Sequence, residues 1–218
     1  MGGTFNISEI KRAAKEALSE QRLTAISLMA MTIFVIAVLQ SIPFLFDNTN
    51  LATGAFLPIF IGTVIAVVGI NSMGEFIQIA RGREGSVREI FSAENFLRKA
   101  LGMWLKFLFV ILWTLLFIIP GIVKFFSYYF VPYILADSPG VTAVEAISIS
   151  SRMTRGYKWR IFVFILSWLG WWLLSVITLG IVWIFYAGPY YNTAVGVLYL
   201  NLKERALEDG IIEYAEFS

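Results

Sequence analysis

The sequence contains no cysteine and no histidine among its 218 residues. Without cysteine a chain has no disulfide framework, no thiolate nucleophile and no cysteine-ligated metal. Without histidine it lacks the commonest general base and the commonest metal ligand. The two absences exclude catalytic triads, haem ligation and most zinc chemistry. We therefore expect no metal site and no cofactor. The chain also carries no paired carboxylates at the spacing that hydrolysis requires, so we expect a protein that is not an enzyme.

Charge is also scarce, because only 15% of the residues are charged whereas 58% are hydrophobic. Soluble domains usually carry about 25% charged residues. A water-soluble fold of this length cannot hide so much apolar surface, which indicates that lipid is the solvent. The net charge of +2 is too small to suggest binding to nucleic acid, and none is expected as a partner.

The long hydrophobic runs predict six membrane-spanning segments. A helix needs roughly 20 residues to cross a bilayer, and the length of each run is close to this number. The predicted segments are 23–46, 56–80, 103–119, 122–136, 161–179 and 181–200. They form three hairpins, and the second and third are short enough that a re-entrant arrangement stays open.

Three turns separate the members of these hairpins. Residues 47–50, DNTN, have the composition of a polar turn. Pro120 lacks a backbone donor and Gly121 permits positive φ, so this pair predicts a tight turn between the third and fourth segments. Residues 178–180, Thr-Leu-Gly, predict the corresponding turn in the last hairpin.

The basic residues predict the orientation. All lysines and arginines except Lys124 fall on one side of the predicted hairpins, and none lies in the three turns inside them. Such residues stay in the cytoplasm. We therefore expect an all-α protein of the bacterial inner membrane with both termini in the cytoplasm.

A threefold plan is predicted within one domain, 1–218, made of units 6–80, 85–137 and 140–202 and a cytoplasmic tail, 203–218. An amphipathic segment precedes each hairpin, at 7–20, 85–100 and 141–156, and such helices normally lie at the membrane interface. The letters of the second and third units also match in part, as in MWLKFLFVILW and KWRIFVFILSW. Two interpretations of this internal repeat stay open: a duplication of the kind found in transporters, and the simple duplication of a stable hairpin.

Three blocks carry a resemblance to a known family. They are PGIVKFFSYYFVPYILAD, then AVEAISISSRMTRGYKWRIFVFILSWLGWWLL, then GPYYNTAVGVLY. Together they resemble a bacterial multispanning membrane family that is known as domain of unknown function nine-seven-five, over residues 85–202. That family is similar in hydropathy to the membrane portion of some glycerophosphodiester phosphodiesterases. The resemblance implies a helical inner-membrane protein and supplies no catalytic residues.

Polar residues inside the apolar runs are the candidate binding residues. Lys124 lies three residues beyond Gly121. It either anchors the hairpin at the outer interface or faces a cavity, where it offers a cation to a phosphate or carboxylate. In the second case Tyr133, on the same helix, would line the cavity. Asn192 is predicted to hydrogen-bond to another helix or to backbone near Pro189.

A second candidate is the face formed by Asn71, Glu75 and Gln78, which follow a helical spacing. It is either an interfacial polar face, with Glu75 paired to Arg81 or Arg83, or a proton-coupled or cation site. Nearby, Gly62, Ala66 and Gly69 form a stripe of small residues, which predicts close approach of another helix.

These observations favour a protein that binds, moves or organises an amphipathic substrate, either a lipid or a membrane-active peptide. An ion-coupled transporter of small solutes is one alternative, and it predicts a hydrated cavity around Glu75 or Lys124. A structural scaffold or partner-recruiting subunit is another, and it predicts a packed interior. The expected partners are the bilayer, anionic lipid headgroups at its cytoplasmic face, and a protein partner or a second copy.

Overall fold

The computed structural model describes residues 6–46, 52–116 and 118–217, and over these residues the chain forms helices joined by loops and contains no strand. The first half contains α1 Ile7–Glu20, α2 Arg22–Ser41, η1 Ile42–Leu45, η2 Ala52–Phe56, α3 Leu57–Ala80, η3 Arg88–Phe91 and α4 Phe96–Leu116. The second half contains α5 Ile118–Ser127, α6 Val131–Asp137, α7 Ala143–Met153, α8 Lys158–Leu166, α9 Leu169–Ile177, η4 Trp183–Ala187, α10 Gly188–Glu208 and η5 Tyr214–Phe217.

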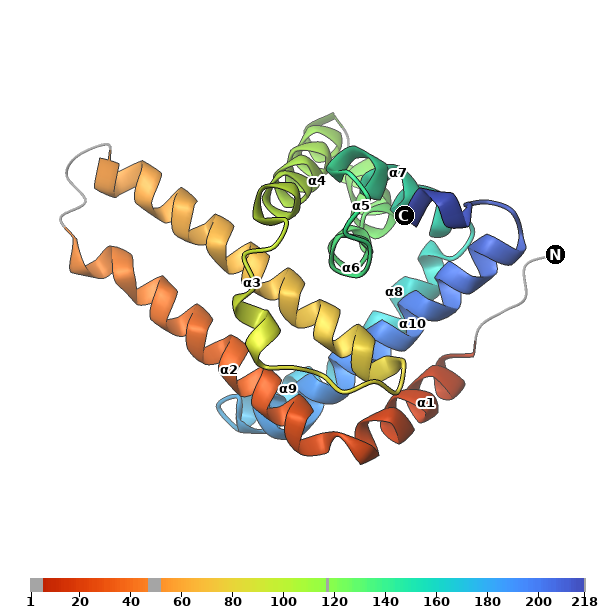
Figure 1. The fold of residues 1–218 in the computed structure, drawn as a ribbon, viewed down its shortest axis with the longest axis horizontal. Helices are drawn as coiled ribbons and strands as arrows, with labels where there is room; N and C mark the ends of the chain where they lie inside the picture. Colours follow the sequence, from red (N-terminus) through yellow and green to blue (C-terminus); the bar gives the residue numbers. More distant parts are fainter. Residues whose placement is uncertain (1–5, 47–51, 117, 218) are drawn as a thin grey trace.

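Within the described residues, three helical segments are long and apolar enough to cross a membrane: Arg22–Leu45, Thr53–Ala80 and Lys158–Ile177. The first two form the α2–α3 hairpin, which extends away from the rest of the molecule (Figure 1). Its predicted turn at 47–50 lies outside the described residues. The third comprises α8 and α9, which are separated by a short break at Ser167 and Trp168.

The prediction for Pro120 and Gly121 is wrong, because both residues lie inside α5 rather than in a turn. Gly121 does not adopt positive φ. Its role is packing: a Cβ placed on Gly121 would lie 2.3 Å from Thr114 Oγ1 and 2.7 Å from Thr114 Cα on α4. Pro120 is tolerated because it lies in the first turn of α5, where no intrahelical donor is required. The proline–glycine pair thus permits close contact between two helices.

The predicted turn at 178–180 is confirmed. Leu179 and Gly180 both have positive φ, of 51° and 85°, and the Gly180 amide donates to the carbonyl of Ser175 at 2.7 Å. This pattern of a left-handed residue followed by a bond back across the last helical turn ends a helix sharply. The chain then returns through η4 and α10.

The segments that precede the hairpins differ from one another. In α1 the residues Ile10, Ala14 and Leu18 are buried, and α1 packs along α10. Residues 85–100 do not form one helix: the chain is irregular up to η3, and α4 begins only at Phe96. The third segment forms α7, which begins after Thr142 with a capping box to Glu145.

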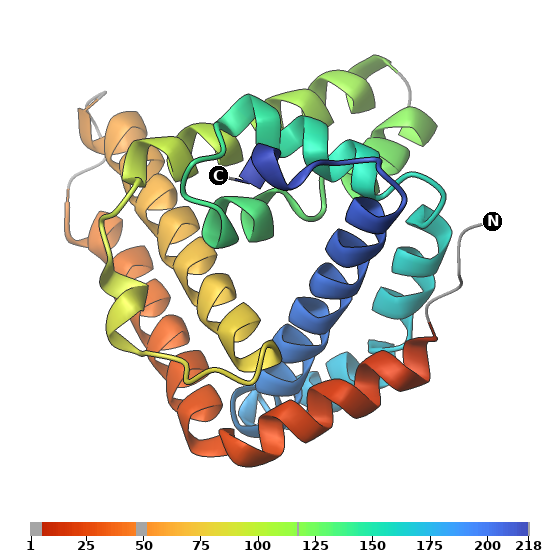
Figure 2. The same ribbon diagram turned by 45° about the vertical axis from the view of Figure 1, so that its right-hand side comes forward.

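The core lies where α3, α6 and α10 meet, and its largest fully buried side chains include Trp168, Tyr199, Phe130 and Phe164. Figure 2 shows α3 and α10 as two sides of a triangular frame, with α6 between them. Contact between α3 and α10 is close because Gly196 has no side chain. A Cβ there would lie 3.1 Å from the carbonyl oxygen of Phe76.

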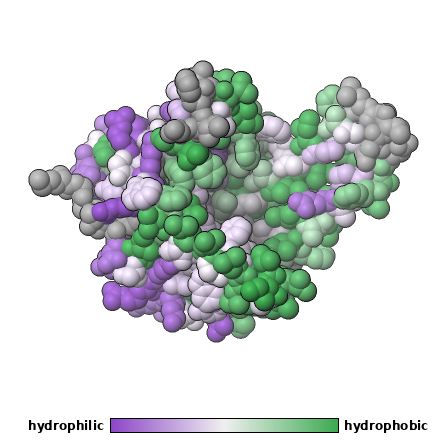
Figure 3. All heavy atoms as spheres, turned by 180° about the vertical axis from the view of Figure 1, so that it is seen from behind, coloured by the Kyte–Doolittle hydropathy of each residue, from purple (hydrophilic) through white to green (hydrophobic). Residues whose placement is uncertain are grey.

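Polar and apolar surfaces are separated along the molecule. Seen from behind, hydrophilic side chains gather at one end, and hydrophobic side chains cover much of the remaining face (Figure 3). The hydrophilic end is the one at which α1 begins and α10 ends (Figure 1). Helix α10 continues to Glu208, beyond the predicted tail boundary at 203, and the following residues fold back so that Arg152 of α7 pairs with Glu216.

Candidate functional site

The predicted polar face of α3 holds a neighbouring segment of the chain. Asn71 donates to the carbonyl oxygens of Ile90 and Ser92, at 3.1 and 2.8 Å, and accepts a hydrogen bond from Lys99 Nζ at 2.6 Å. One turn later, a carboxylate oxygen of Glu75 accepts the backbone amide of Ser86 at 2.6 Å. These bonds fix residues 86–92 against α3, so this face binds the chain itself.

Two further details of that face differ from the prediction. Glu75 pairs with a backbone amide, and Arg81 makes its ion pair with Asp137 instead. Gln78 is half-buried, and its backbone carbonyl accepts the amides of Arg81 and Arg83 where α3 ends. Burial lowers the pKa of Lys99, and the positive charge of Arg98 lowers it further.

Lys124 contacts aromatic rings. Its ammonium lies 4.7 Å from the ring centroid of Trp113 on α4 and 5.6 Å from that of Tyr128. A cation over an aromatic face is stabilised by the ring's negative potential, especially where water is scarce. Lys124 therefore joins α5 to α4 within the second hairpin.

Tyr133 and Asn192 lie in packed regions of the structure. Tyr133 is 4% exposed, and its ring stacks on that of Tyr129, whose hydroxyl lies 2.8 Å from the hydroxyl of Tyr191. The side-chain amide of Asn192 donates to the carbonyl of Gly188 in its own helix at 2.9 Å and contacts the Met29 sulfur at 3.7 Å. The predicted binding residues therefore occupy four separate places and do not surround one cavity.

Sequence reasoning missed an ionic cluster around Asp137. Asp137 ends α6, and its side chain is 2% exposed. It accepts contacts from Arg81 at 2.5 Å, Lys203 at 2.8 Å and the Tyr199 hydroxyl at 3.0 Å. Only the run of apolar residues directly before Asp137 hinted at its burial. The cluster joins the ends of α3 and α6 to α10.

Sequence reasoning also missed the hydrogen bonds that the guanidinium of Arg98 donates. It donates to the carbonyl oxygens of Leu135, Ser138 and Val141, at 2.7, 2.7 and 2.8 Å. The carbonyls at a helix C-terminus have no partners within the helix. Arg98, at the start of α4, thus supplies the donors that the end of α6 and the following loop require.

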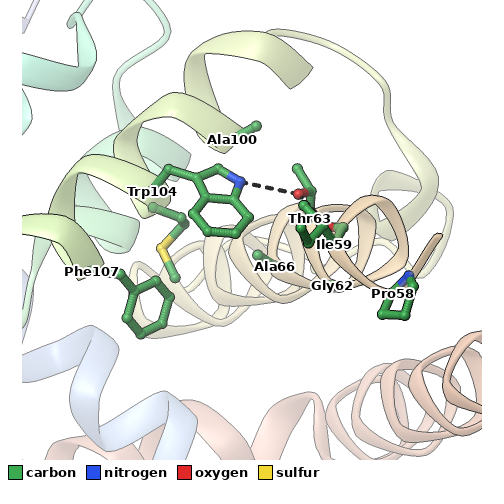
Figure 4. Close-up of a pocket in the computed structure, with 9 residues that line it drawn as sticks. Pro58, Ile59, Gly62, Thr63, Ala66, Ala100, Trp104 and Phe107 are labelled. Atoms are coloured by element: carbon green, nitrogen blue, oxygen red, sulfur yellow. Dashed lines mark hydrogen bonds between the residues drawn. The ribbon is translucent and has the colours of Figure 1, made fainter. Parts of the chain in front are cut away.

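A groove with a volume of about 350 Å³ lies between α3 and α4 (Figure 4). Its polar contact is between Trp104 and Thr63, where the indole N–H donates to the hydroxyl at 3.1 Å. The lining residues are Pro58, Ile59, Gly62, Thr63, Ala66, Ala100, Met103, Trp104 and Phe107. All of them are uncharged, so the groove suits an apolar group.

This groove corrects the prediction for the stripe of small residues on α3. No atom of another helix lies within 4 Å of a Cβ placed on Gly62 or Gly69. Gly62 and Ala66 of this stripe therefore line the groove, whereas close packing on α3 occurs at Gly74, where a Cβ would lie 3.3 Å from Ala136 of α6. Small residues at this place leave space that a larger side chain would fill.

The groove opens onto an apolar surface. Ile59, Trp104 and Phe107 on its rim are each about half exposed, at 51%, 49% and 51%. Phe60 and Leu108 nearby in sequence are exposed to a similar degree. An apolar group at this surface would therefore meet uncharged lining residues.

Comparison with known proteins identifies a family and no function. Searches of curated proteins and of solved structures find no match. The model of one family, described as "Protein of unknown function (DUF975)", matches residues 55–206. This stretch includes α3, α4 and the whole of the Asp137 cluster, and it covers more than half of the sequence. The chain therefore belongs to the DUF975 family.

Proposed function

We propose that this chain is a non-enzymatic membrane protein that binds the hydrocarbon chain of a lipid or another amphipathic substrate in the groove between α3 and α4. The observation that carries the proposal is the groove itself. Its volume of about 350 Å³ lies within the usual range for ligand pockets, roughly 300–1,000 Å³. Its uncharged lining and lateral opening match an acyl chain.

The proposed location is the bacterial inner membrane, with six segments in the bilayer and both termini in the cytoplasm. The three spanning candidates and the separation of polar from apolar surface support this location. The distribution of lysine and arginine supports the orientation. The predicted internal repeat, the interfacial role of the amphipathic segments and the similarity to glycerophosphodiester phosphodiesterases stay predictions.

The two alternatives rest on different observations. An ion-coupled transporter requires a hydrated cavity at Glu75 or Lys124, but Glu75 accepts a backbone amide and Lys124 lies over Trp113. A scaffold requires a packed interior, and the fully buried Trp168, Tyr199 and Phe130 favour it as the second candidate. The scaffold proposal leaves the groove without a function.

A photo-crosslinking experiment tests the acyl-chain proposal. The protein is reconstituted with a phospholipid that carries a diazirine on its acyl chain, and adducts are mapped by peptide mass spectrometry. We expect adducts on residues 58–66 and 100–107, because these line the groove. Ala66→Phe fills the groove and should remove most of them. Gly170→Phe on the exposed surface of α9 is the matched control, since a Cβ there meets nothing within 4 Å.

The outcome that contradicts the proposal is equally specific. If the adducts spread evenly over exposed apolar residues such as Leu173 and Val176 of α9, the groove has no preference for acyl chains. The same holds if Ala66→Phe leaves the adduct pattern unchanged while the protein keeps its thermal stability.

A further inference from the structure

A second cavity lies at the bend between α1 and α2. The chain turns at Gln21, between the end of α1 and the start of α2, and the first turns of α10 pack against the bend. The cavity has a volume of about 130 Å³. Its lining residues are Lys15, Leu18, Ser19, Arg22, Ile26, Phe185, Tyr186, Pro189 and Tyr190. We call it the elbow pocket.

The elbow pocket has two cations on its wall and no acid. Lys15 and Arg22 both line it, and they lie on opposite sides of the bend. Among the residues that the structure describes, neither Lys15 nor Arg22 takes part in an ion pair. Two neighbouring cations without a counter-charge favour an anion between them.

The start of α2 adds further positive potential. Gln21 precedes α2 but makes no side-chain cap to it. Its amide group is used elsewhere: it donates to the carbonyl of Arg83 at 2.7 Å and accepts the amide of Gly85 at 3.0 Å. The first backbone amides of α2 therefore lack a side-chain acceptor, and such amides favour negative charge. This effect adds to the charges of Lys15 and Arg22.

The remaining wall of the elbow pocket is apolar and aromatic. Leu18, Ile26, Phe185 and Pro189 supply hydrocarbon surface beside the cations. Tyr190 is held in place because its hydroxyl donates to the carbonyl of Lys11 at 3.0 Å. A ligand that matches the whole pocket carries an anionic group next to a hydrocarbon chain, which is the chemistry of an anionic phospholipid.

The location agrees with such a ligand. Arg22 begins the first candidate span, and the next residue, Leu23, is 83% exposed. Phe185 on the opposite wall is 55% exposed. The pocket thus lies where a basic, partly polar surface changes to an apolar one, which is the level of lipid headgroups.

We propose that the elbow pocket binds one anionic phospholipid, with its phosphate between Lys15 and Arg22 and the first part of its acyl chain against Ile26 and Phe185. The inference depends on the membrane location proposed above, but not on the α3–α4 groove. It names a site with a preference for headgroup charge, whereas the groove selects for hydrocarbon alone.

Native mass spectrometry of the full chain tests this proposal. The protein is exchanged from detergent containing equal amounts of phosphatidylglycerol and phosphatidylcholine, and the retained lipids are counted. We expect one retained phosphatidylglycerol. Lys15→Gln combined with Arg22→Gln should weaken its retention by about tenfold to thirtyfold. Both cations attract the anionic headgroup, and the double variant loses both contributions. Lys15→Arg combined with Arg22→Lys should preserve it.

The matched control removes the same charge from another place. Arg88→Gln combined with Arg155→Gln neutralises two exposed arginines that do not line the elbow pocket. If this control loses phosphatidylglycerol to the same degree, the binding reflects net charge and the pocket is not a site. Unchanged retention in the Lys15 and Arg22 variant also overturns the proposal, as does displacement by inorganic phosphate, which would identify a free anion as the ligand.

The two proposals fail independently. The variant of Lys15 and Arg22 should keep the acyl-chain adducts in the α3–α4 groove, and Ala66→Phe should keep the retained phosphatidylglycerol. Thermal unfolding of each variant verifies folding, since Lys15 lies on the exposed side of α1.

Discussion

The guanidinium of Arg81, at the end of α3, lies 2.5 Å from the carboxylate of Asp137, at the end of α6. Lys203 and Tyr199 of α10 contact the other oxygen of the same carboxylate, at 2.8 and 3.0 Å. Three helices that are distant in sequence are thus joined through one buried acid. This arrangement neutralises Asp137 with two cations, which a buried carboxylate requires.

Replacement of Asp137 by Asn should destabilise the fold strongly. The substitution leaves Arg81 and Lys203 close together without their shared counter-charge. Removing one partner of a buried ion pair typically costs about 3–5 kcal/mol, and we expect about 3 kcal/mol because Arg81 and Lys203 are partly exposed. The free energy of unfolding in mixed detergent micelles measures the effect.

Tyr199→Phe is the control for that experiment, because it removes one hydrogen bond and keeps both ion pairs. Its expected cost is about 1.5 kcal/mol. A loss in Asp137→Asn no larger than that in Tyr199→Phe would show that the ion pairs contribute little.

Stability should decrease at acidic pH through the same residue. Burial by itself raises the pKa of Asp137, but the hydrogen bonds and charges of Arg81 and Lys203 outweigh it and hold the pKa below its usual value. The pKa in the unfolded chain is about 3.9. The unfolded state therefore binds the proton first, so this stabilisation is present above about pH 4 and is lost as the pH falls through the folded pKa.

Unfolding measured between pH 7 and pH 3 tests this dependence. The slope also includes Glu216, whose pKa is lowered by Arg152, and Glu145, whose pKa is lowered by Thr142. The difference between the wild type and Asp137→Asn isolates the contribution of Asp137. Parallel curves for the two proteins would contradict the assignment.

Substitution of Gly121 by Val should separate α5 from α4. The added side chain would overlap Thr114, whose Oγ1 lies 2.3 Å from the Cβ position. Overpacking of this kind costs about 1–3 kcal/mol. Gly62→Ala is the matched control, because its Cβ meets nothing within 4 Å and alanine favours the helix by about 1 kcal/mol. Thermal unfolding should therefore shift in opposite directions for the two variants, and equal shifts would contradict the role of Gly121 in packing.

Asn71→Leu should release the segment between α3 and α4. The variant loses both hydrogen bonds to the carbonyls of Ile90 and Ser92, and it leaves Lys99 without its acceptor. We expect faster amide hydrogen exchange in residues 84–92, with a smaller change in global stability, because local segments open independently of the core. Exchange that rises equally in α10 would indicate global destabilisation instead. Glu75→Gln should affect the amide of Ser86 in particular.

Much of the helical framework could be predicted from the sequence, because helix formation depends on neighbouring residues. The apolar runs predicted α2, α3 and the α8–α9 segment, which are long and apolar enough to cross a membrane. Thr178, Leu179 and Gly180 predicted a turn that the structure contains. These features follow from local composition and from the need to satisfy backbone hydrogen bonds in hydrocarbon.

Predictions that depended on the partner of a residue were less successful. Gly121 suits a turn and a close helix contact equally well, and only the position of Thr114 distinguishes the two. Residues 85–100 have the apolar pattern of one α-helix, but Asn71 and Glu75 of α3 hold 86–92 in a path whose only helical part is the short 3-10 helix η3. In both cases a contact from another helix determined the outcome.

The sequence by itself determined that the chain is a helical, apolar protein without thiol or imidazole chemistry, since these properties are summed from individual residues. Only the tertiary structure decided that Asp137 meets Arg81 and Lys203, that Gly62 and Ala66 face an open groove, and that Lys15 and Arg22 share a pocket. The physical reason is that such meetings depend on the angles and distances at which helices pack. Many small contacts along the whole chain set these angles and distances, so no short sequence motif predicts them.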